Sequence, residues 1–522
     1  MTERIFQWWD YPGFTFLTIW SLWALYSFLV YWFSNPDWSS QPVSYSILTI
    51  MLLVILTNNQ GRWFLLPCMK KPKPLSAKPG CKVAVVTTFV PGAEPLEMLE
   101  KTVNALVSLD YAHDTWVLDE ADDDAVKALC ARLGVHYFSR KLFPHYQAAA
   151  GTFQEHSKHG NYNAWLREHG FANYEFVMIV DPDHVPTPTF LSKVLGYFED
   201  TKVAYVQVAQ AYYNQSASFI ARGAAEETYA YYSYIQMASY GMSYPIIVGS
   251  HNIHRVMALK QVGGLPAHDA EDVLLTLIYR AQDWQGVYVP EILARGLAPV
   301  DWSGYLCQQR RWARSVLDIK LRRYSDFSIK LSWKSRIMSC LHGLNFLHRS
   351  ILIVLSLVLT SVILAIGNAP SIVSYLTIQK LGALWLVLQL CEFYRQRFYL
   401  DPIKERGIHW RVILLQYGKW PWFILALVDV LFAREVPYIL TSKVESKSKN
   451  HPLLLPNLLI IAFLCGAWAI GQRLGVVVHP LVYIVASIFF IGSIILIWTD
   501  YWRFPAPYNN EVSLRSMSEQ RY

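Results

Sequence analysis

The sequence predicts a membrane protein that carries an α/β domain between its membrane-spanning segments. Hydrophobic residues make up 53% of the 522 residues and charged residues only 16%, which is too apolar for an ordinary soluble chain. The 20 Trp and 32 Tyr fit this class, because aromatic rings with a polar group collect at the bilayer interface. Residues 82–299 instead alternate short β-rich runs with helical runs, which predicts a mostly parallel sheet flanked by helices on both faces.

The composition also narrows the partners. The net charge is +7, and no Lys/Arg cluster interleaved with aromatic residues marks a nucleic-acid surface. We therefore expect no nucleic-acid partner. The seven cysteines form no CxxC pair, so the sequence predicts neither a zinc site nor a disulfide framework.

Six apolar segments are long enough to cross a bilayer. Residues 14–33 form a run of about 20 residues without a charge, enough for a hydrocarbon core of about 30 Å. This run is too long for a cleavable signal peptide. A second candidate span at 43–56, which extends to 66, also follows it closely. Further candidates occupy residues 351–366, 372–390, 453–470 and 476–498.

Basic residues predict the orientation of these spans. The segment 34–41 has no Lys or Arg, whereas the chain around and after residue 62 is basic at Arg62, Lys70, Lys71, Lys73, Lys78 and Lys82. By the positive-inside rule, the N-terminus and the α/β region are expected in the cytosol. Lys419 and Asp429 interrupt an apolar run at 412–432, and basic clusters flank it on both sides. We interpret this run as an interfacial or re-entrant helix, which leaves six spans and two cytosolic termini.

Polar residues follow the predicted strands of the α/β region. The β-rich runs are 82–90, 115–119, 135–138, 175–180 and 203–208, with helical patterns such as 95–109 and 124–133 between them. The strand ends carry Thr87, Thr88, Asp119, Glu120, Asp181 and Asp183. Ligands of a parallel sheet bind at the carboxyl ends of its strands. The first strand is followed by no GxGxxG motif, so a dinucleotide-binding fold is disfavoured.

The pair Asp181-Pro182-Asp183 lies where an apolar strand ends. In the turn after a strand, two carboxylates one residue apart can both face one divalent cation. We interpret the pair as a metal-diphosphate site. An Asp-Pro turn with no ligand is the plain structural alternative.

Two further motifs follow downstream. Ala270-Glu271-Asp272 precedes a helical run at 273–282, where acids are also favoured by the helix dipole alone. Residues 308–312, Gln-Gln-Arg-Arg-Trp, lie in a basic amphipathic segment at 301–323, and 332–347 is a second mixed helix. Both segments are predicted at the inner membrane surface, where Arg and Trp also serve as simple anchors.

The order of these motifs resembles the processive family 2 glycosyltransferases, the group that contains cellulose, chitin, curdlan and hyaluronan synthases. The resemblance covers roughly residues 82–325. Its motifs are, in order, Thr87/Thr88, Asp119, Lys158-His159-Gly160-Asn161-Tyr162-Asn163, Asp181-x-Asp183, Gly249-Ser250, Glu271-Asp272 and Gln308-x-x-Arg311-Trp312. It implies a glycosyltransferase domain of the GT-A type.

The resemblance also implies a role for each site residue. The nucleotide-binding residues would be Thr88, Asp119, Lys158, Asp181, Asp183 and Arg311. Asp181 and Asp183 would hold Mg²⁺ or Mn²⁺ beside the leaving UDP. Asp272 would be the general base, with Glu271 beside it in the catalytic pair. The acceptor would meet Gly249, Ser250, Gln308 and Trp312.

A weaker match follows the interfacial run. Residues 438–443, Tyr-Ile-Leu-Thr-Ser-Lys, resemble the gating loop of cellulose and curdlan synthases. The resemblance implies that Thr441 and Lys443 close over bound UDP. The run of tyrosines at 229–234 we interpret as a packing face rather than as stacking surface for sugars.

The chain departs from the family pattern at three motifs. The acidic pair reads Asp119-Glu120-Ala121, Ala270 stands where a Thr is usual, and 246–248 are Ile-Ile-Val where an aromatic residue and a Cys are common. The last two departures lie in the acceptor region of the family. They bear on acceptor or linkage preference.

The resemblance implies a processive, inverting β-glycosyltransferase that polymerises UDP-glucose and passes the glucan through its own spans. UDP-GlcNAc, alone or with UDP-glucuronate, is an alternative donor. Transfer of one sugar to a lipid carrier, or a transporter whose domain only binds nucleotide, are further alternatives. The expected partners are the UDP-sugar, the growing polysaccharide and the bilayer of the cell membrane, and the sequence leaves open a homo-oligomer or an accessory export subunit.

The predicted organisation has seven parts. They are two spans in 1–69, a cytosolic GT-A domain in 70–300, interfacial helices in 301–348, a pair of spans in 349–394, an interfacial helix and gating loop in 395–450, a second pair of spans in 451–500 and a cytosolic tail in 501–522.

Overall fold

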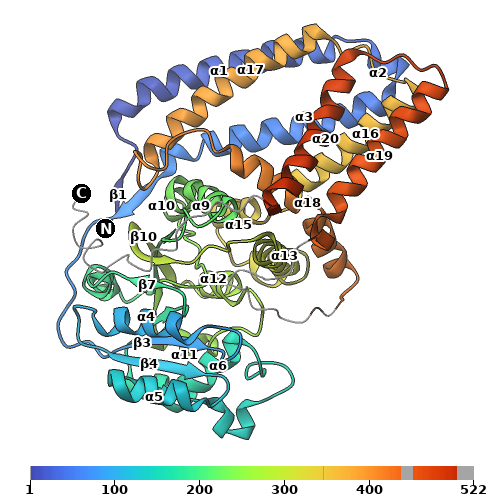
Figure 1. The fold of residues 1–522 in the computed structure, drawn as a ribbon. Helices are drawn as coiled ribbons and strands as arrows, with labels where there is room; N and C mark the ends of the chain where they lie inside the picture. The colour runs from blue at the N-terminus through green and yellow to red at the C-terminus, as the bar shows by residue number, and fades with distance from the viewer. Residues whose placement is uncertain (1, 345, 435, 437–450, 502–522) are drawn as a thin grey trace.

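A bundle of long helices lies at one end of the molecule and a sheet with its covering helices at the other (Figure 1). The computed structural model describes residues 2–344, 346–434, 436 and 451–501. The predicted gating loop, with Thr441 and Lys443, and the tail from 502 onward lie outside the described residues.

The sheet has eight strands in the order β5-β4-β3-β6-β9-β8-β10-β7. Five of them match predicted runs within a few residues: β3 (Val83–Phe89), β4 (Asp114–Asp119), β5 (His136–Phe138), β6 (Phe176–Val180) and β8 (Val203–Tyr212). The prediction of a mostly parallel sheet is confirmed, because β3 pairs in parallel with β4 and β6, β4 with β5, and β8 with β10.

Three strands of this sheet were not predicted. They are β7 (Val185–Pro186), β9 (Asn252–Arg255) and β10 (Gln285–Gly296). β9 runs antiparallel between β6 and β8, and its sequence Asn-Ile-His-Arg has only one apolar residue. Such a short polar run carries too little hydrophobic pattern to be recognised as a strand.

Both faces of the sheet are covered, as predicted. On one face, Val83 and Val85 pack with Leu106 of α4 (Leu96–Val107). On the other, Ala84 and Val86 pack with helices α6 (Lys158–Trp165), α11 (Val256–Val262) and α12 (Glu271–Ala281). Successive strand residues point to opposite faces, so the unbroken apolar run of β3 supplies both layers. The remaining helices of this region are α5 (Asp124–Leu133), α7 (Phe171–Asn173), α8 (Phe190–Val194), α9 (Phe219–Ala230) and α10 (Gln236–Gly241).

Six helices in the described part of the chain are long and apolar enough to cross a membrane, as predicted. They are α1 (Tyr11–Phe33), α3 (Pro42–Trp63), α16 (His348–Ile366), α17 (Tyr375–Arg395), α19 (Leu455–Arg473) and α20 (Pro480–Tyr501). Large apolar side chains such as Phe16, Trp23 and Trp385 face outward, which suits a hydrocarbon surrounding. The chain is therefore a multi-pass membrane protein.

Helices α13 (Trp302–Asp318), α15 (Trp333–Leu344) and α18 (Trp410–Leu431) lie between the bundle and the sheet (Figure 1). Helix α18 continues through Pro421, packs along α13 and is not among the six spanning candidates. Its Lys419 and Asp429 are buried against Glu227 and Arg310. The remaining short elements are β1 (Thr2–Arg4), β2 (Lys70–Pro72), α2 (Asp37–Ser40) and α14 (Tyr324–Ser328).

Candidate functional site

Four loops meet at the edge of the sheet where β6 ends. Asp181 and Asp183 follow β6, Lys158 opens α6, and Asp272 is the second residue of α12. Because β9 runs antiparallel to β6, it begins at the edge where β6 ends, and this places Ser250 beside Asp181. The Asp181 amide donates a hydrogen bond to Ser250 Oγ at 2.9 Å.

Lys158 is the centre of this site. Its Nζ lies 2.7 Å from Asp181 Oδ1, 2.6 Å from the Gly249 carbonyl oxygen and 3.6 Å from Glu271 Oε1. Burial opposes the charge of this ammonium, yet the carboxylates of Asp181 and Glu271 hold the pKa of Lys158 well above its usual value. The site therefore keeps a fixed positive charge between two acidic loops.

The acid pair lies on the other side of Gly249. The Gly249 amide donates to Asp272 Oδ2 at 2.5 Å and the Val273 amide donates to Oδ1 at 2.7 Å. Burial raises the pKa of Asp272, and hydrogen bonds from these amides oppose the rise. Burial also raises the pKa of Glu271, while Lys158 opposes it. A half-buried carboxylate held in place in this way suits proton transfer.

Asp183 and His184 form the candidate cation-binding side of the site. Oxygen and nitrogen atoms of Asp181, Asp183 and His184 lie within 4.8 Å of one another. His184 Nδ1 lies 3.0 Å from Asp183 Oδ1, and the Leu297 amide donates to Asp183 Oδ2 at 3.4 Å. Two hard carboxylates and an imidazole fit Mg²⁺ or Mn²⁺. Sequence reasoning did not assign His184, although its position directly after the acidic pair was a usable signal.

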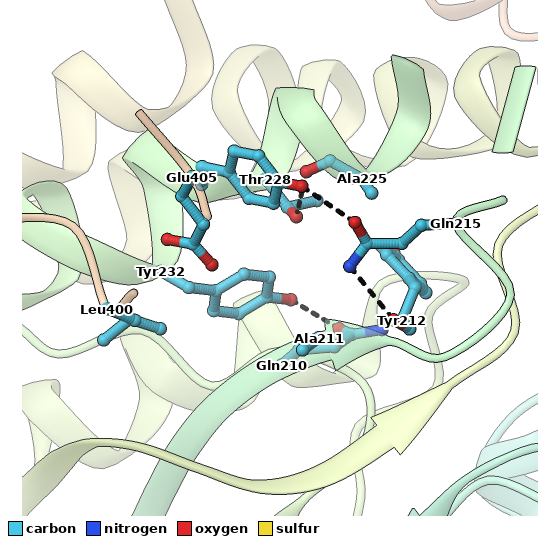
Figure 2. A pocket seen from close by; sticks show the side chains of 10 residues that line it. Gln210, Ala211, Tyr212, Gln215, Ala225, Thr228, Tyr232, Leu400 and Glu405 are labelled. Carbon is cyan, nitrogen blue, oxygen red and sulfur yellow. Dashed lines mark hydrogen bonds between the residues drawn. The ribbon is translucent and has the colours of Figure 1, made fainter. Parts of the chain in front are cut away.

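A chain of contacts leads from His184 to a small cavity. His184 Nε2 lies 3.2 Å from Gln210 Nε2. The Tyr232 hydroxyl donates to Gln210 Oε1 at 2.5 Å (Figure 2). Tyr229, Tyr232 and Tyr234 are buried. The interpretation of the tyrosine run as a packing face is therefore confirmed at these three positions.

Asp119 is held by its own loop. Its carboxylate accepts hydrogen bonds from the amides of Ala121 at 2.9 Å and Asp123 at 2.5 Å and from the Tyr137 hydroxyl at 2.9 Å. It is fully buried. Thr88 is half-buried near the end of β3. The predicted contacts of Asp119 and Thr88 with the nucleotide remain predictions.

Helix α13 carries the Gln-Gln-Arg-Arg-Trp motif. Gln308 is buried, Arg311 is half-buried and Trp312 is 39% exposed. A hydrogen-bond contact and an ion pair tie the helix to the loop before Glu271: His268 Nε2 lies 3.1 Å from Asp318 and Arg314 lies 3.0 Å from Asp269. The motif helix is thus held against the loop that precedes the acid pair.

Known proteins resemble this chain in sequence and in fold. The model of the family described as "Glycosyltransferase like family 2" matches residues 83–315. A cellulose synthase catalytic subunit (UDP-forming) of Xanthomonas axonopodis pv. citri is 29% identical over 51% of this chain and 36% of its own length. Cellulose synthase 1 of Komagataeibacter xylinus is 28% identical over 52% of this chain and 17% of its own length. The chain thus spans about a third or less of these two relatives.

A solved structure shares the fold. A mannosyltransferase of Pyrobaculum calidifontis, in complex with GDP-Man and Mn²⁺, superposes with a TM-score of 0.50 at 15% identity. The match covers 76% of this chain and 99% of that protein. The sheet and these matches define a glycosyltransferase domain of the GT-A fold. Residues 83–315 match the family 2 glycosyltransferase model and the chain is similar to cellulose synthases, so the resemblance read from the motifs is confirmed.

Proposed function

We propose that this protein is a processive, inverting β-glycosyltransferase that transfers glucose from UDP-glucose to a growing β-glucan and passes the polymer through its own spans. The observation that carries the proposal is the Lys158 cluster, which consists of Lys158, Asp181, Gly249 and Asp272. Lys158 contacts Asp181 at 2.7 Å and the Gly249 carbonyl oxygen, and the Gly249 amide in turn donates to Asp272. The similarity to UDP-forming cellulose synthases supports the choice of donor.

The diphosphate end of the reaction lies between Lys158 and the carboxylate pair. A divalent cation held by Asp181 and Asp183, with His184 beside them, would neutralise charge on the leaving UDP. Lys158 stays charged beside this group and attracts the diphosphate. Asp181 is held by Lys158 and Ser250, so these contacts also orient the nucleotide side.

Asp272 performs the proton transfer. Its carboxylate takes the proton of an acceptor hydroxyl as that oxygen attacks the anomeric carbon of the donor sugar. The new C–O bond forms on the face opposite the diphosphate, whose C–O bond breaks with its electron pair, so the configuration inverts. The amides of Gly249 and Val273 keep the carboxylate in place before the acceptor arrives.

Trp312 and the helices around it provide the acceptor side. Its exposed ring offers a flat apolar surface for a sugar, and it lies on a helix that packs against α18 beneath the bundle. With the catalytic domain and both termini in the cytosol, as the basic residues predict, the six spans would receive the polymer.

The experiment is polymer synthesis by the full chain purified in detergent. It is incubated with Mg²⁺ or Mn²⁺ and one radiolabelled donor at a time: UDP-glucose, UDP-GlcNAc, UDP-glucuronate or GDP-mannose. We expect solvent-insoluble polymer from UDP-glucose, and linkage analysis identifies the product. Polymer from UDP-GlcNAc but not from UDP-glucose would contradict the donor, and label that extracts into organic solvent would indicate transfer to a lipid carrier.

Asp272→Asn tests the chemistry itself. We expect turnover to fall by about a hundredfold or more, because the general base is lost, while UDP affinity measured by calorimetry changes little. Asp283→Asn is the matched control, since Asp283 is exposed just beyond the same helix and its positive φ of 63° suits Asn. Full turnover of Asp272→Asn would show that Asp272 is not the general base.

A further inference from the structure

Three of the six spanning helices end around one cleft. Gln7 of the cleft directly precedes the turn Trp8–Asp10 that leads into α1, and Lys71 follows the turn Leu66–Cys68 that comes after α3. Phe398 is the last residue of the turn that extends α17. In Figure 1, β1 lies where the ends of α1 and α17 meet the rest of the protein. The cleft therefore lies at the level where hydrocarbon gives way to lipid head groups.

The cleft is large and polar. Its volume is about 430 Å³, and its polar lining consists of Glu3, Arg4, Gln7, Lys71 and Arg397. Three of these side chains are cations and one is an acid. Strands β1 and β2 form this wall by pairing antiparallel, with Glu3 opposite Lys71 and Arg4 opposite Lys70.

The charges of the cleft are not balanced. Lys71 lies 2.9 Å from Glu3, and Arg397 lies 3.2 Å from Asp10 just outside the lining. Arg4 is exposed, and in the described part of the chain no carboxylate lies within ion-pair distance of it. This surplus of positive charge suits an anion, and Arg and Lys side chains together with an amide suit a phosphate.

The aromatic residues beside the cleft support its level in the membrane. Trp8 is 76% exposed and Trp9 is 58% exposed, directly after Gln7. Exposed Trp rings at the end of a span are typical of the bilayer interface. The phosphate that is present at this level in high local concentration is that of the lipids.

We propose that this cleft binds the phosphate of an anionic lipid head group from the leaflet on the side of the glycosyltransferase domain. The ligand would link β1, β2 and the end of α17, three segments distant in sequence, and would fix the domain against the bundle. The proposal rests on the membrane location of the chain and not on the transfer reaction, so either can fail alone.

Lipid binding by the full-length protein tests the proposal. The purified chain is titrated with dihexanoyl phosphatidylglycerol, dihexanoyl phosphatidylcholine or inorganic phosphate in detergent, and binding is followed by native mass spectrometry and by the thermal unfolding midpoint. The variant is Arg4→Ala/Lys71→Ala. The matched control is Lys330→Ala/Lys334→Ala, which removes two exposed charges from a segment away from the cleft.

We expect phosphatidylglycerol to bind more tightly than phosphatidylcholine, and the Arg4/Lys71 variant to lose about tenfold or more in affinity. The Lys330/Lys334 control should stay within about twofold. Equal binding of phosphatidylglycerol by the variant and the original chain would overturn the site. Binding of inorganic phosphate as tight as that of the lipid would overturn the assignment to a lipid, because the acyl chains would then contribute nothing. UDP binding serves as the check that the variant is folded, since neither residue lies near the Lys158 cluster.

Discussion

His184 depends on the absence of a side chain at Gly296. A Cβ at Gly296 would lie 2.1 Å from His184 Nε2, which is far inside van der Waals contact. His184 is in turn 3.0 Å from Asp183. Gly296, the last residue of β10, therefore leaves the space in which the His184 ring lies beside Asp183, the predicted metal ligand.

Gly296→Ala is expected to weaken the binding of Mn²⁺ by roughly tenfold to a hundredfold, because partners that orient metal ligands contribute to this extent. Electron paramagnetic resonance of free Mn²⁺ measures it without any need for turnover. Gly382→Ala is the control, since a Cβ there meets nothing within 4 Å and helix α17 tolerates Ala. Unchanged Mn²⁺ affinity in Gly296→Ala would show that the ring does not support the cation.

Glu405 projects into the cavity of Figure 2, beside Tyr232 and Leu400. Burial raises its pKa from the usual 4.5 to about 7. An acid whose pKa is raised by folding stabilises the native state when protonated. The contribution is complete below about pH 4.5 and is lost as the pH rises to about 7.

Glu405→Gln should remove this dependence, because the amide keeps an acceptor for the Asp401 amide and carries no charge. Between pH 5 and pH 8, the unfolding free energy of the original chain should fall by about 1–3 kcal/mol more than that of the variant. Thermal or chemical unfolding followed by Trp fluorescence over this range gives the comparison. Parallel curves for the two chains would mean that Glu405 ionises normally.

At the scale of elements, the acid pair is positioned by a neighbouring helix. The Ala270 amide donates to His268 Nδ1 at 3.0 Å, and His268 Nε2 lies 3.1 Å from Asp318 of α13. The hydrogen bond to His268 lowers the pKa of Asp318. Ala270 has no side-chain hydroxyl that could hold the backbone before Glu271. The hydrogen bond from the Ala270 amide to the His268 imidazole holds it.

Asp318→Ala should loosen the loop and lower kcat by about tenfold or more, because small displacements of a catalytic group are costly. The affinity for UDP should remain, since Lys158 and Asp181 are untouched. Steady-state kinetics with a UDP titration separates the two effects. Asp326→Ala, an exposed acid on α14, is the control, and a rise in KM with unchanged kcat would contradict the positioning role.

At the scale of the whole molecule, a buried polar network joins the glycosyltransferase domain to the membrane side. Lys419 of α18 lies 2.7 Å from Glu227 of α9 and 3.1 Å from Gln309 of α13. The Tyr305 hydroxyl and Gln416 Nε2 also donate to Glu227, each at 2.6 Å. One carboxylate thus receives contacts from two helices of the membrane side.

Lys419→Met should destabilise the protein by about 3–5 kcal/mol, because it leaves the Glu227 carboxylate buried without its cation. Adding Glu227→Gln should restore much of that loss. Chemical unfolding in detergent of both single variants and the double variant measures the coupling between the two residues. Additive losses would show that the pair does not act as a unit.

Much of the architecture follows from the sequence alone. The spans, the first strands of the sheet and the basic interfacial helices are local patterns of hydrophobicity and charge, and each is present in about 20 residues or fewer. The order of the motifs also indicates the family, because each motif is a short string. Strand β9 escaped this reasoning because a polar strand of four residues has no such pattern.

The tertiary structure decided which of these residues act together. Lys158 meets Gly249 across 91 positions of sequence, and the Gly249 amide meets Asp272 across 23. The His184 ring is positioned by Gly296 and Gln210, and the basic cleft lies where the ends of three spans converge. Such contacts depend on strand order and on the direction of β9. Local composition does not encode them, since a side chain's partners are set by the packing of the whole chain.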